Sequence, residues 1–256
     1  MDKKMVFFDL DGTLLDEDKK IRPDVRDAVR KLMQNDILVG LATGRAPFLF
    51  DFVRKELGID SFIALNGQYV VHEGKPIYKN PMEREQLHRL VQLAEAHNHP
   101  LVFLNHLEMR ANQEKNKDIA TGFSDLKIEY PLVDPDFYQG RDIFQTLLFC
   151  KEEDESLYLN EVNDFQYIRW HDLSLDVLPS VGSKALAIER VIEHAGVKQE
   201  NTYAFGDGLN DIEMLKFVGK GVAMGNAFEE TKEVADFVTD DVANNGLVKG
   251  LEKLEL

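Results

Sequence analysis

Several aspartates lie in short polar segments that each follow an apolar stretch of the chain. Asp9 and Asp11 follow one such stretch near the N-terminus, and Asp207 and Asp211 follow another near the C-terminus. A group of carboxylates is costly to bury together unless a cation neutralises it. Carboxylate oxygens of this kind suit a hard ion such as Mg²⁺. The pattern therefore predicts a magnesium site wherever the fold brings the two segments together.

The pair Asp9 and Asp11 could serve both steps of a phosphoryl transfer. One carboxylate can attack phosphorus and form an aspartyl-phosphate, which splits one difficult step into two. A carboxyl group two residues later can protonate the departing alkoxide and then deprotonate water for the second step. Gly12 permits a backbone turn close to a ligand. Because Lys184 and the hydroxyl of Thr43 can offset charge on the phosphoryl oxygens, the set predicts chemistry on a phosphate ester.

The elements around these segments predict an α/β fold. In both terminal parts of the chain, short apolar runs typical of buried strands alternate with segments of helical periodicity. The predicted strands are 5–8, 37–42, 61–65, 202–205, 222–224 and 237–239, and the predicted helices are 23–35, 48–57, 183–195, 211–218 and 229–235. This alternation favours a Rossmann-like parallel sheet with helices on both faces. The ligand crevice of such a sheet lies at the carboxyl ends of the strands, where Asp9, Thr43 and Asp207 all fall.

The middle of the chain has a different pattern, which predicts an α+β module inserted into the parallel sheet. Its predicted helices are 83–97 and 153–162, and its predicted strands are 101–104, 144–150, 167–171 and 174–178. We therefore expect a core formed by residues 1–80 and 180–256 and a separate domain formed by residues 81–179.

Composition and charge exclude several classes of function. The chain carries 46 acidic and 30 basic side chains, a formal charge of −16, so its surface should repel nucleic acid and anionic lipid. Cys150, the only cysteine, lies in an apolar run that predicts a buried structural thiol. No signal peptide or membrane-length apolar run is evident. We expect a cytoplasmic protein with no nucleic-acid or membrane partner.

Four motifs, in this order along the chain, resemble those of the haloacid dehalogenase-like hydrolase superfamily. They are Asp9-Leu10-Asp11-Gly12-Thr13, Thr43-Gly44-Arg45, Lys184, and Gly206-Asp207-Gly208-Leu209-Asn210-Asp211. They span almost the whole chain, and their combination is highly specific although each motif alone is not. The module between the second and third motifs is similar to the large α+β cap of the Cof-type phosphatases. Ala185 follows the lysine where the family often has glycine, a minor departure because Lys184 itself is kept.

The resemblance implies a role for each acidic residue of the motifs. Asp9 would be the nucleophile and Asp11 the general acid/base, with Lys184 part of the catalytic set. Mg²⁺ would be bound by Asp9, the backbone carbonyl of Asp11 and Asp207. Asp211 would be a supporting carboxylate of the same metal site.

The resemblance also implies a phosphate-binding set and a class of substrate. The phosphate would be bound by the Leu10 backbone, Thr43, Gly44, Lys184 and Asn210, with Arg45 and Asn66 lining the site. A cap formed by residues 81–179 would close over the site and exclude bulky substrates. The expected substrate is thus a small phosphorylated metabolite, such as a sugar phosphate or a phosphorylated cofactor, and we expect a monomer or weak homodimer.

Two other functions stay open at this point. A sugar phosphomutase would return the phosphate to a sugar, and it would need convergent cap arginines, for which the module offers Arg84, Arg89, Arg110, Arg141 and Arg169. A phospho-acceptor switch similar to a bacterial receiver domain also uses an Asp, a Thr and a Lys at strand ends. The large insert and Asp11 argue against the switch, because a signalling domain should retain its phosphate. Dehalogenation is disfavoured, since a carbon–halogen bond needs no acid/base such as Asp11.

Overall fold

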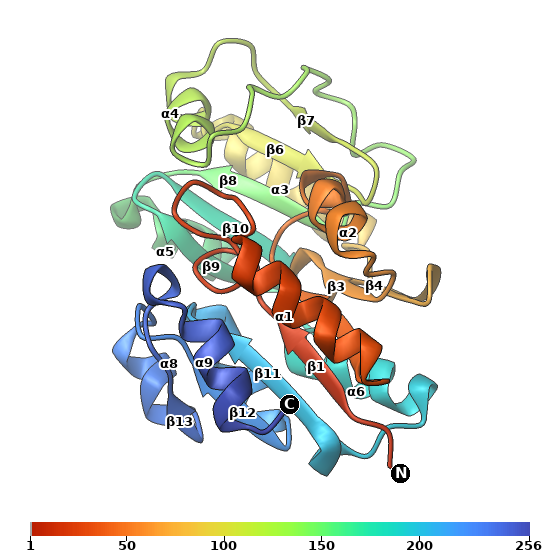
Figure 1. The fold of residues 1–256 in the computed structure, drawn as a ribbon. Helices are drawn as coiled ribbons and strands as arrows, with labels where there is room; N and C mark the ends of the chain where they lie inside the picture. The colour runs from red at the N-terminus through yellow and green to blue at the C-terminus, as the bar shows by residue number, and fades with distance from the viewer. Residues whose placement is uncertain (1) are drawn as a thin grey trace. The chain divides into compact units, whose positions relative to one another are not determined.

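The computed structural model describes residues 2–256, which divide into two compact units (Figure 1). The core unit comprises the chain up to Lys79 and the segment Gly182–Leu256, and the inserted unit comprises Asn80–Val181. Each unit has its own cluster of buried apolar side chains. At the ends of the inserted unit, Asn80 Nδ2 donates a hydrogen bond of 2.6 Å to the carbonyl oxygen of Val181.

The core unit is built on an eight-stranded sheet in the order β13-β12-β11-β1-β2-β3-β4-β5. Its strands are β1 (Met5–Phe8), β2 (Leu38–Ala42), β3 (Phe62–Ala64), β4 (Tyr69–His72), β5 (Lys75–Lys79), β11 (Thr202–Gly206), β12 (Lys220–Ala223) and β13 (Phe237–Val238). Neighbouring strands from β13 to β3 pair in parallel, which confirms the predicted fold class. The hairpin β4–β5 pairs antiparallel and was not among the predicted strands. All of β1 is buried, as its unbroken apolar run predicts.

Helices cover both faces of this sheet. They are α1 (Pro23–Gln34), α2 (Asp51–Leu57), α6 (Lys184–Ala195), α7 (Ile212–Phe217), α8 (Glu229–Val234) and α9 (Gly246–Lys253). One layer contains α1, which contacts α2 and α9 (Figure 1). The other layer contains α7, which contacts α6 and α8. The predicted helix 48–57 is shorter than expected, because a 3₁₀ turn over Pro47–Leu49 precedes α2. The last helix, α9, was not predicted.

The inserted unit contains a five-stranded antiparallel sheet in the order β7-β6-β8-β10-β9. Its elements are α3 (Arg84–Ala96), β6 (Leu101–Leu104), β7 (Met109–Ala111), α4 (Lys117–Asp125), β8 (Gln145–Phe149), α5 (Glu152–Glu161), β9 (Phe165–His171) and β10 (Ser174–Pro179). The predicted α+β character is confirmed, and β7 and α4 are additional elements. Cys150 is buried, and burial raises the pKa of its thiol to about 11, consistent with a structural thiol. Within residues 2–256, no helix is long and apolar enough to cross a membrane.

His72 is a buried ionisable group of the core sheet, and it predicts a dependence of stability on pH. Its Nδ1 lies 3.1 Å from Ser61 Oγ, and its ring packs edge-on against His194. Burial lowers the pKa of His72 below its usual value near 6.5, so the unfolded chain binds the proton more readily than the folded protein. We therefore expect the free energy of unfolding to fall as the pH drops from 7 to 5. Urea unfolding at both pH values should show a smaller fall for His72→Gln than for the wild-type protein.

The matched control for this prediction is His88→Gln, because His88 is exposed on α3. This variant should keep the wild-type dependence on pH. An equal fall in stability for wild type and His72→Gln would show that His72 contributes nothing to it.

Candidate active site

The first, second and fourth motifs lie at one edge of the core sheet, where the parallel strands β1, β2 and β11 end. The backbone N–H of Asp9 donates to the carbonyl oxygen of Phe205 at 3.0 Å, directly after β1. The N–H of Thr43 donates to the carbonyl oxygen of Ile63 at 2.9 Å, directly after β2. Because adjacent parallel strands end on the same side, the register of the sheet brings these segments together. The side chain of Leu10 is buried beneath this edge.

Lys184 begins α6 and lies buried between two carboxylates of these segments. Its Nζ donates one hydrogen bond to Asp9 Oδ1 and one to Asp211 Oδ1, both 2.6 Å long, and its side chain is 1% exposed. Burial alone would favour the neutral amine, but the charges of Asp211 and Asp9 outweigh it and raise the pKa of Lys184 above its usual value. Lys184 is therefore a cation held against Asp9.

Asp9, Asp207 and Asp211 form a carboxylate cluster with more negative charge than Lys184 can neutralise. One oxygen from each residue lies within 4.8 Å of the others. Burial raises the pKa of Asp9 well above its usual value, and Asp211 and Asp207 add to the rise while Lys184 opposes it. Burial and the charge of Asp211 likewise raise the pKa of Asp207 to about 7. A divalent cation would remove this repulsion, and the all-oxygen donor set fits Mg²⁺.

Asp211 is fully buried, and both of its carboxylate oxygens already accept hydrogen bonds. Oδ1 accepts from Lys184, and Oδ2 accepts from the backbone N–H groups of Asp207 and Gly208, both at 2.9 Å. These bonds stabilise the turn that carries Asp207. Both oxygens of Asp211 are therefore engaged in hydrogen bonds, and its role as a supporting carboxylate of a metal site stays a prediction.

The carboxylate of Asp11 is directed toward two cations. Arg45 donates to both of its oxygens, from Nε at 2.7 Å and from Nη2 at 2.6 Å, and Lys19 donates from Nζ to Oδ1 at 2.7 Å. Burial alone would raise the pKa of Asp11, but the hydrogen bonds and charges of Arg45 and Lys19 outweigh it and lower the pKa. Arg45 was expected to line the site. Lys19 was not expected, because a lysine in an acidic loop cannot be distinguished by sequence from a solvated one.

Asn66 connects the predicted phosphate-binding residues of the second and fourth motifs. Its N–H donates to the carbonyl oxygen of Thr43 at 3.1 Å, and its Oδ1 accepts from Asn210 Nδ2 at 3.0 Å. A Cβ atom on Gly44 would lie 3.1 Å from the Asn66 amide, so the two residues are in close contact. Leu65 and Asn66 both have positive φ angles, 54° and 55°, which are uncommon for residues other than glycine. Such strain is typical of functional sites.

A surface hollow of about 300 Å³ borders Asp11 and Asp207. It is lined by Asp11, Gly12, Asp16, Glu17, Lys19, Asp207, Asn226, Asp241 and Val242. Asn226 and Asp241 come from the C-terminal part of the chain and were not expected at the site. No motif pattern marks them, because only the folded chain brings the loops after β12 and β13 beside the first motif.

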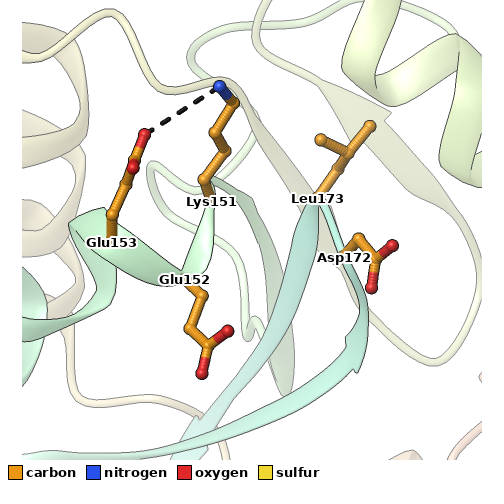
Figure 2. Close-up of a pocket in the computed structure, with 5 residues that line it drawn as sticks. All are labelled: Lys151, Glu152, Glu153, Asp172 and Leu173. Atoms are coloured by element: carbon orange, nitrogen blue, oxygen red, sulfur yellow. Dashed lines mark ion pairs between the residues drawn. The ribbon is translucent and has the colours of Figure 1, made fainter.

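Another hollow, of about 600 Å³, lies on the inserted unit (Figure 2). Its lining residues are Lys151, Glu152, Glu153, Asp172 and Leu173, and Lys151 forms an ion pair of 3.9 Å with Glu153. None of the residues predicted to act in catalysis or binding lines this hollow.

Comparisons with known proteins identify the family of this chain. The family model of the haloacid dehalogenase-like hydrolases matches residues 6–251. A curated relative from Bacillus subtilis (strain 168), "Putative phosphatase YkrA", is 46% identical over 256 residues, which cover 100% of this chain and 99% of the relative. A crystal structure of a protein from Geobacillus kaustophilus HTA426 has 52% sequence identity and a TM-score of 0.95, with 99% of each chain covered.

A third similar protein is a sugar phosphatase of subclass IIB of the same superfamily. Its structure has a TM-score of 0.87 and 28% sequence identity, and 99% of each chain is covered. The family match, the coverage of whole relatives and the four motifs assembled on one sheet edge point to the same conclusion. The chain belongs to the haloacid dehalogenase-like hydrolases and is a Cof-type phosphatase.

Proposed function

We propose that this phosphatase hydrolyses small phosphorylated metabolites in a Mg²⁺-dependent reaction that passes through an aspartyl-phosphate on Asp9. The observation that carries the proposal is the buried Lys184, which bonds Asp9 and Asp211 at the edge of the core sheet. A buried carboxylate next to a lysine, with a second carboxyl group two residues later in the chain, can supply the nucleophile, the positive charge and the acid/base of a nucleophilic phosphoryl transfer.

The proposed metal site uses the carboxylates whose repulsion a cation would relieve. Asp9, Asp207 and the backbone carbonyl of Asp11 would bind Mg²⁺, and Asp211 would support them through Lys184 and the turn that it holds. When bound, the ion supplies positive charge to the phosphoryl oxygens and favours the ionised form of Asp9.

The proposed reaction has two displacements at phosphorus. In the first, a carboxylate oxygen of Asp9 forms a bond to phosphorus while the bond to the alcohol oxygen breaks, and Asp11 gives that oxygen a proton. In the second, Asp11 takes a proton from water, the water oxygen bonds to phosphorus, and Asp9 is released. One ester and one water give one alcohol and one inorganic phosphate, and both aspartates return to their starting states.

Arg45 and Lys19 would control when Asp11 can take part. In the structure they hold Asp11 as a carboxylate through three hydrogen bonds. A substrate phosphate is also an anion and competes for these two cations. Loosening their hold on Asp11 would let its carboxyl group take up a proton from solvent before the first displacement, so that Asp11 enters that step as the acid and regains its proton from water in the second.

The substrate class is proposed from the relatives. The subclass IIB relative is described as a sugar phosphatase, which favours a sugar phosphate or a metabolite of similar size. A mutase is less favoured, because arginines of the inserted unit are engaged in ion pairs within it: Arg89 with Asp164, Arg110 with Glu108 and Arg169 with Glu155. A cap role for the inserted unit, a cytoplasmic location and a monomer or weak homodimer stay predictions.

The test is phosphate release from a panel of sugar phosphates, nucleotides, cofactor phosphates and an aryl phosphate. We expect turnover of at least one compound with Mg²⁺, loss of that turnover after chelation, and recovery when Mg²⁺ is added back. Turnover that survives complete chelation would refute the metal requirement. If the protein binds Mg²⁺ but releases phosphate from none of the compounds, the mutase and the phospho-acceptor switch become better supported than the phosphatase.

A further inference from the structure

Asn226 lies in the loop after β12, and its side-chain amide is bonded at both ends although the residue is exposed. Its Nδ2 donates to the carbonyl oxygen of Gly12 at 2.9 Å, across 214 residues of sequence. Its Oδ1 accepts from the backbone N–H of Val242, also at 2.9 Å. An exposed asparagine gains little from such bonds unless they fix something, because water satisfies its amide equally well.

The side-chain nitrogen of Asn226, Nδ2, also lies beside the carboxylate of Asp207. Nδ2 is 3.5 Å from Oδ2 of Asp207, while the other oxygen, Oδ1, accepts a hydrogen bond of 2.8 Å from Thr13 Oγ1. Gly12 packs closely against both side chains. A Cβ atom at this position would lie 2.3 Å from Asp207 Oδ2 and 3.1 Å from Asn226 Nδ2. Its φ of 77° is in the left-handed region that favours glycine. Asp207 is thus restrained on both of its oxygens.

The loop that carries Asn226 is itself fixed to the fourth motif. The N–H of Met224 donates to the carbonyl oxygen of Gly206 at 3.0 Å, and the N–H of Phe228 donates to the carbonyl oxygen of Asp207 at 3.1 Å. Asn226 therefore projects from a support that cannot shift independently of Asp207.

We propose that Asn226 is a positioning residue of the metal site, which holds the Gly12 carbonyl and Asp207 so that the Asp207 carboxylate faces Asp9. The proposal rests on the proposed function, because it presupposes a cation at these carboxylates. Outer partners of this kind orient the groups that bind a metal, and their loss typically lowers metal affinity by about 10- to 100-fold. The competing explanation is that Asn226 only fastens the loop to its neighbours.

The test compares Asn226→Ala with Thr239→Val. Thr239 Oγ1 donates to the carbonyl oxygen of Gly246 at 2.7 Å, so Thr239→Val also removes a side-chain bond to the backbone in the C-terminal part of the chain. Mg²⁺ binding to metal-free protein is measured by titration calorimetry, and thermal unfolding is measured without metal. We expect the Kd for Mg²⁺ to rise about tenfold in Asn226→Ala and to stay at the wild-type value in Thr239→Val.

The outcomes separate this inference from the proposed function. If the wild-type protein binds no Mg²⁺, the proposed metal requirement fails and the inference fails with it. If the wild type binds Mg²⁺ and Asn226→Ala binds it equally well, only the inference is overturned. Asn226 then only holds its loop to the neighbouring backbone. A lower Tm in both variants, with weaker Mg²⁺ binding in Asn226→Ala alone, supports positioning.

Discussion

Replacing Asp9 with asparagine should lower the turnover number by at least about 10⁴-fold, the scale of loss seen when a nucleophile is removed. The amide oxygen that replaces the carboxylate is a poor nucleophile toward phosphorus, so no aspartyl-phosphate can form. The fold should persist, because the neutral amide also relieves repulsion from Asp207 and Asp211. Phosphate release at saturating substrate and Mg²⁺ measures the loss, and thermal unfolding verifies the fold.

Asp27→Asn is the matched control, since Asp27 is exposed on α1 and lies outside the site. It should retain the wild-type turnover number. A turnover number for Asp9→Asn within tenfold of wild type would exclude Asp9 as the nucleophile and would require another acceptor of the phosphoryl group.

Lys184→Met should reduce both stability and catalysis. It removes the cation from a buried carboxylate cluster, and breaking a buried ion pair from one side typically costs about 3–5 kcal/mol. Methionine occupies much of the volume of the lysine stem, so the loss reports mainly on charge. Catalysis should fall by about 10²- to 10³-fold, the usual effect of removing one donor that stabilises the transition state. Urea unfolding of metal-free protein and phosphate release measure the two effects.

Added Mg²⁺ should restore part of the stability of Lys184→Met, because a second cation can neutralise the same carboxylates. Lys55→Met is the control. Lys55 is 77% exposed and pairs with Asp51 at 2.5 Å, and removal of such a surface pair should change stability by about 1 kcal/mol or less. If Lys184→Met were as stable as Lys55→Met, the buried pairs would not contribute the expected stabilisation.

The part of the site that the sequence predicted depends on one topological rule. Segments that follow parallel strands end on one edge of the sheet, so Asp9, Thr43 and Asp207 could be placed together before any coordinates. Lys184 was expected to join them from the start of the helix after the inserted module, and the structure locates it against Asp9. The hairpin β4–β5 was missed, since the signal for its turn at Glu73 and Gly74 is local and weak.

The residues that escaped prediction are those whose partners are distant or whose backbone is unusual. Lys19 and Asn226 carry no distinguishing pattern, because their significance lies in the bonds to Asp11 and Gly12 that only the folded chain creates. The left-handed backbone at Leu65 was equally hidden. Periodicity reports which face of an element is buried, and it says nothing about which loops meet.

The hydrogen bond between Asn80 and Val181 shows that the two ends of the inserted unit lie side by side. The inserted unit is therefore an insertion whose first and last residues are adjacent in space. All eight strands of the core sheet lie outside it. Gene rearrangement or protein engineering can exchange such a segment for another of different length without breaking a strand of the core. The reacting groups of this phosphatase and its inserted unit can thus change independently of each other over evolutionary time.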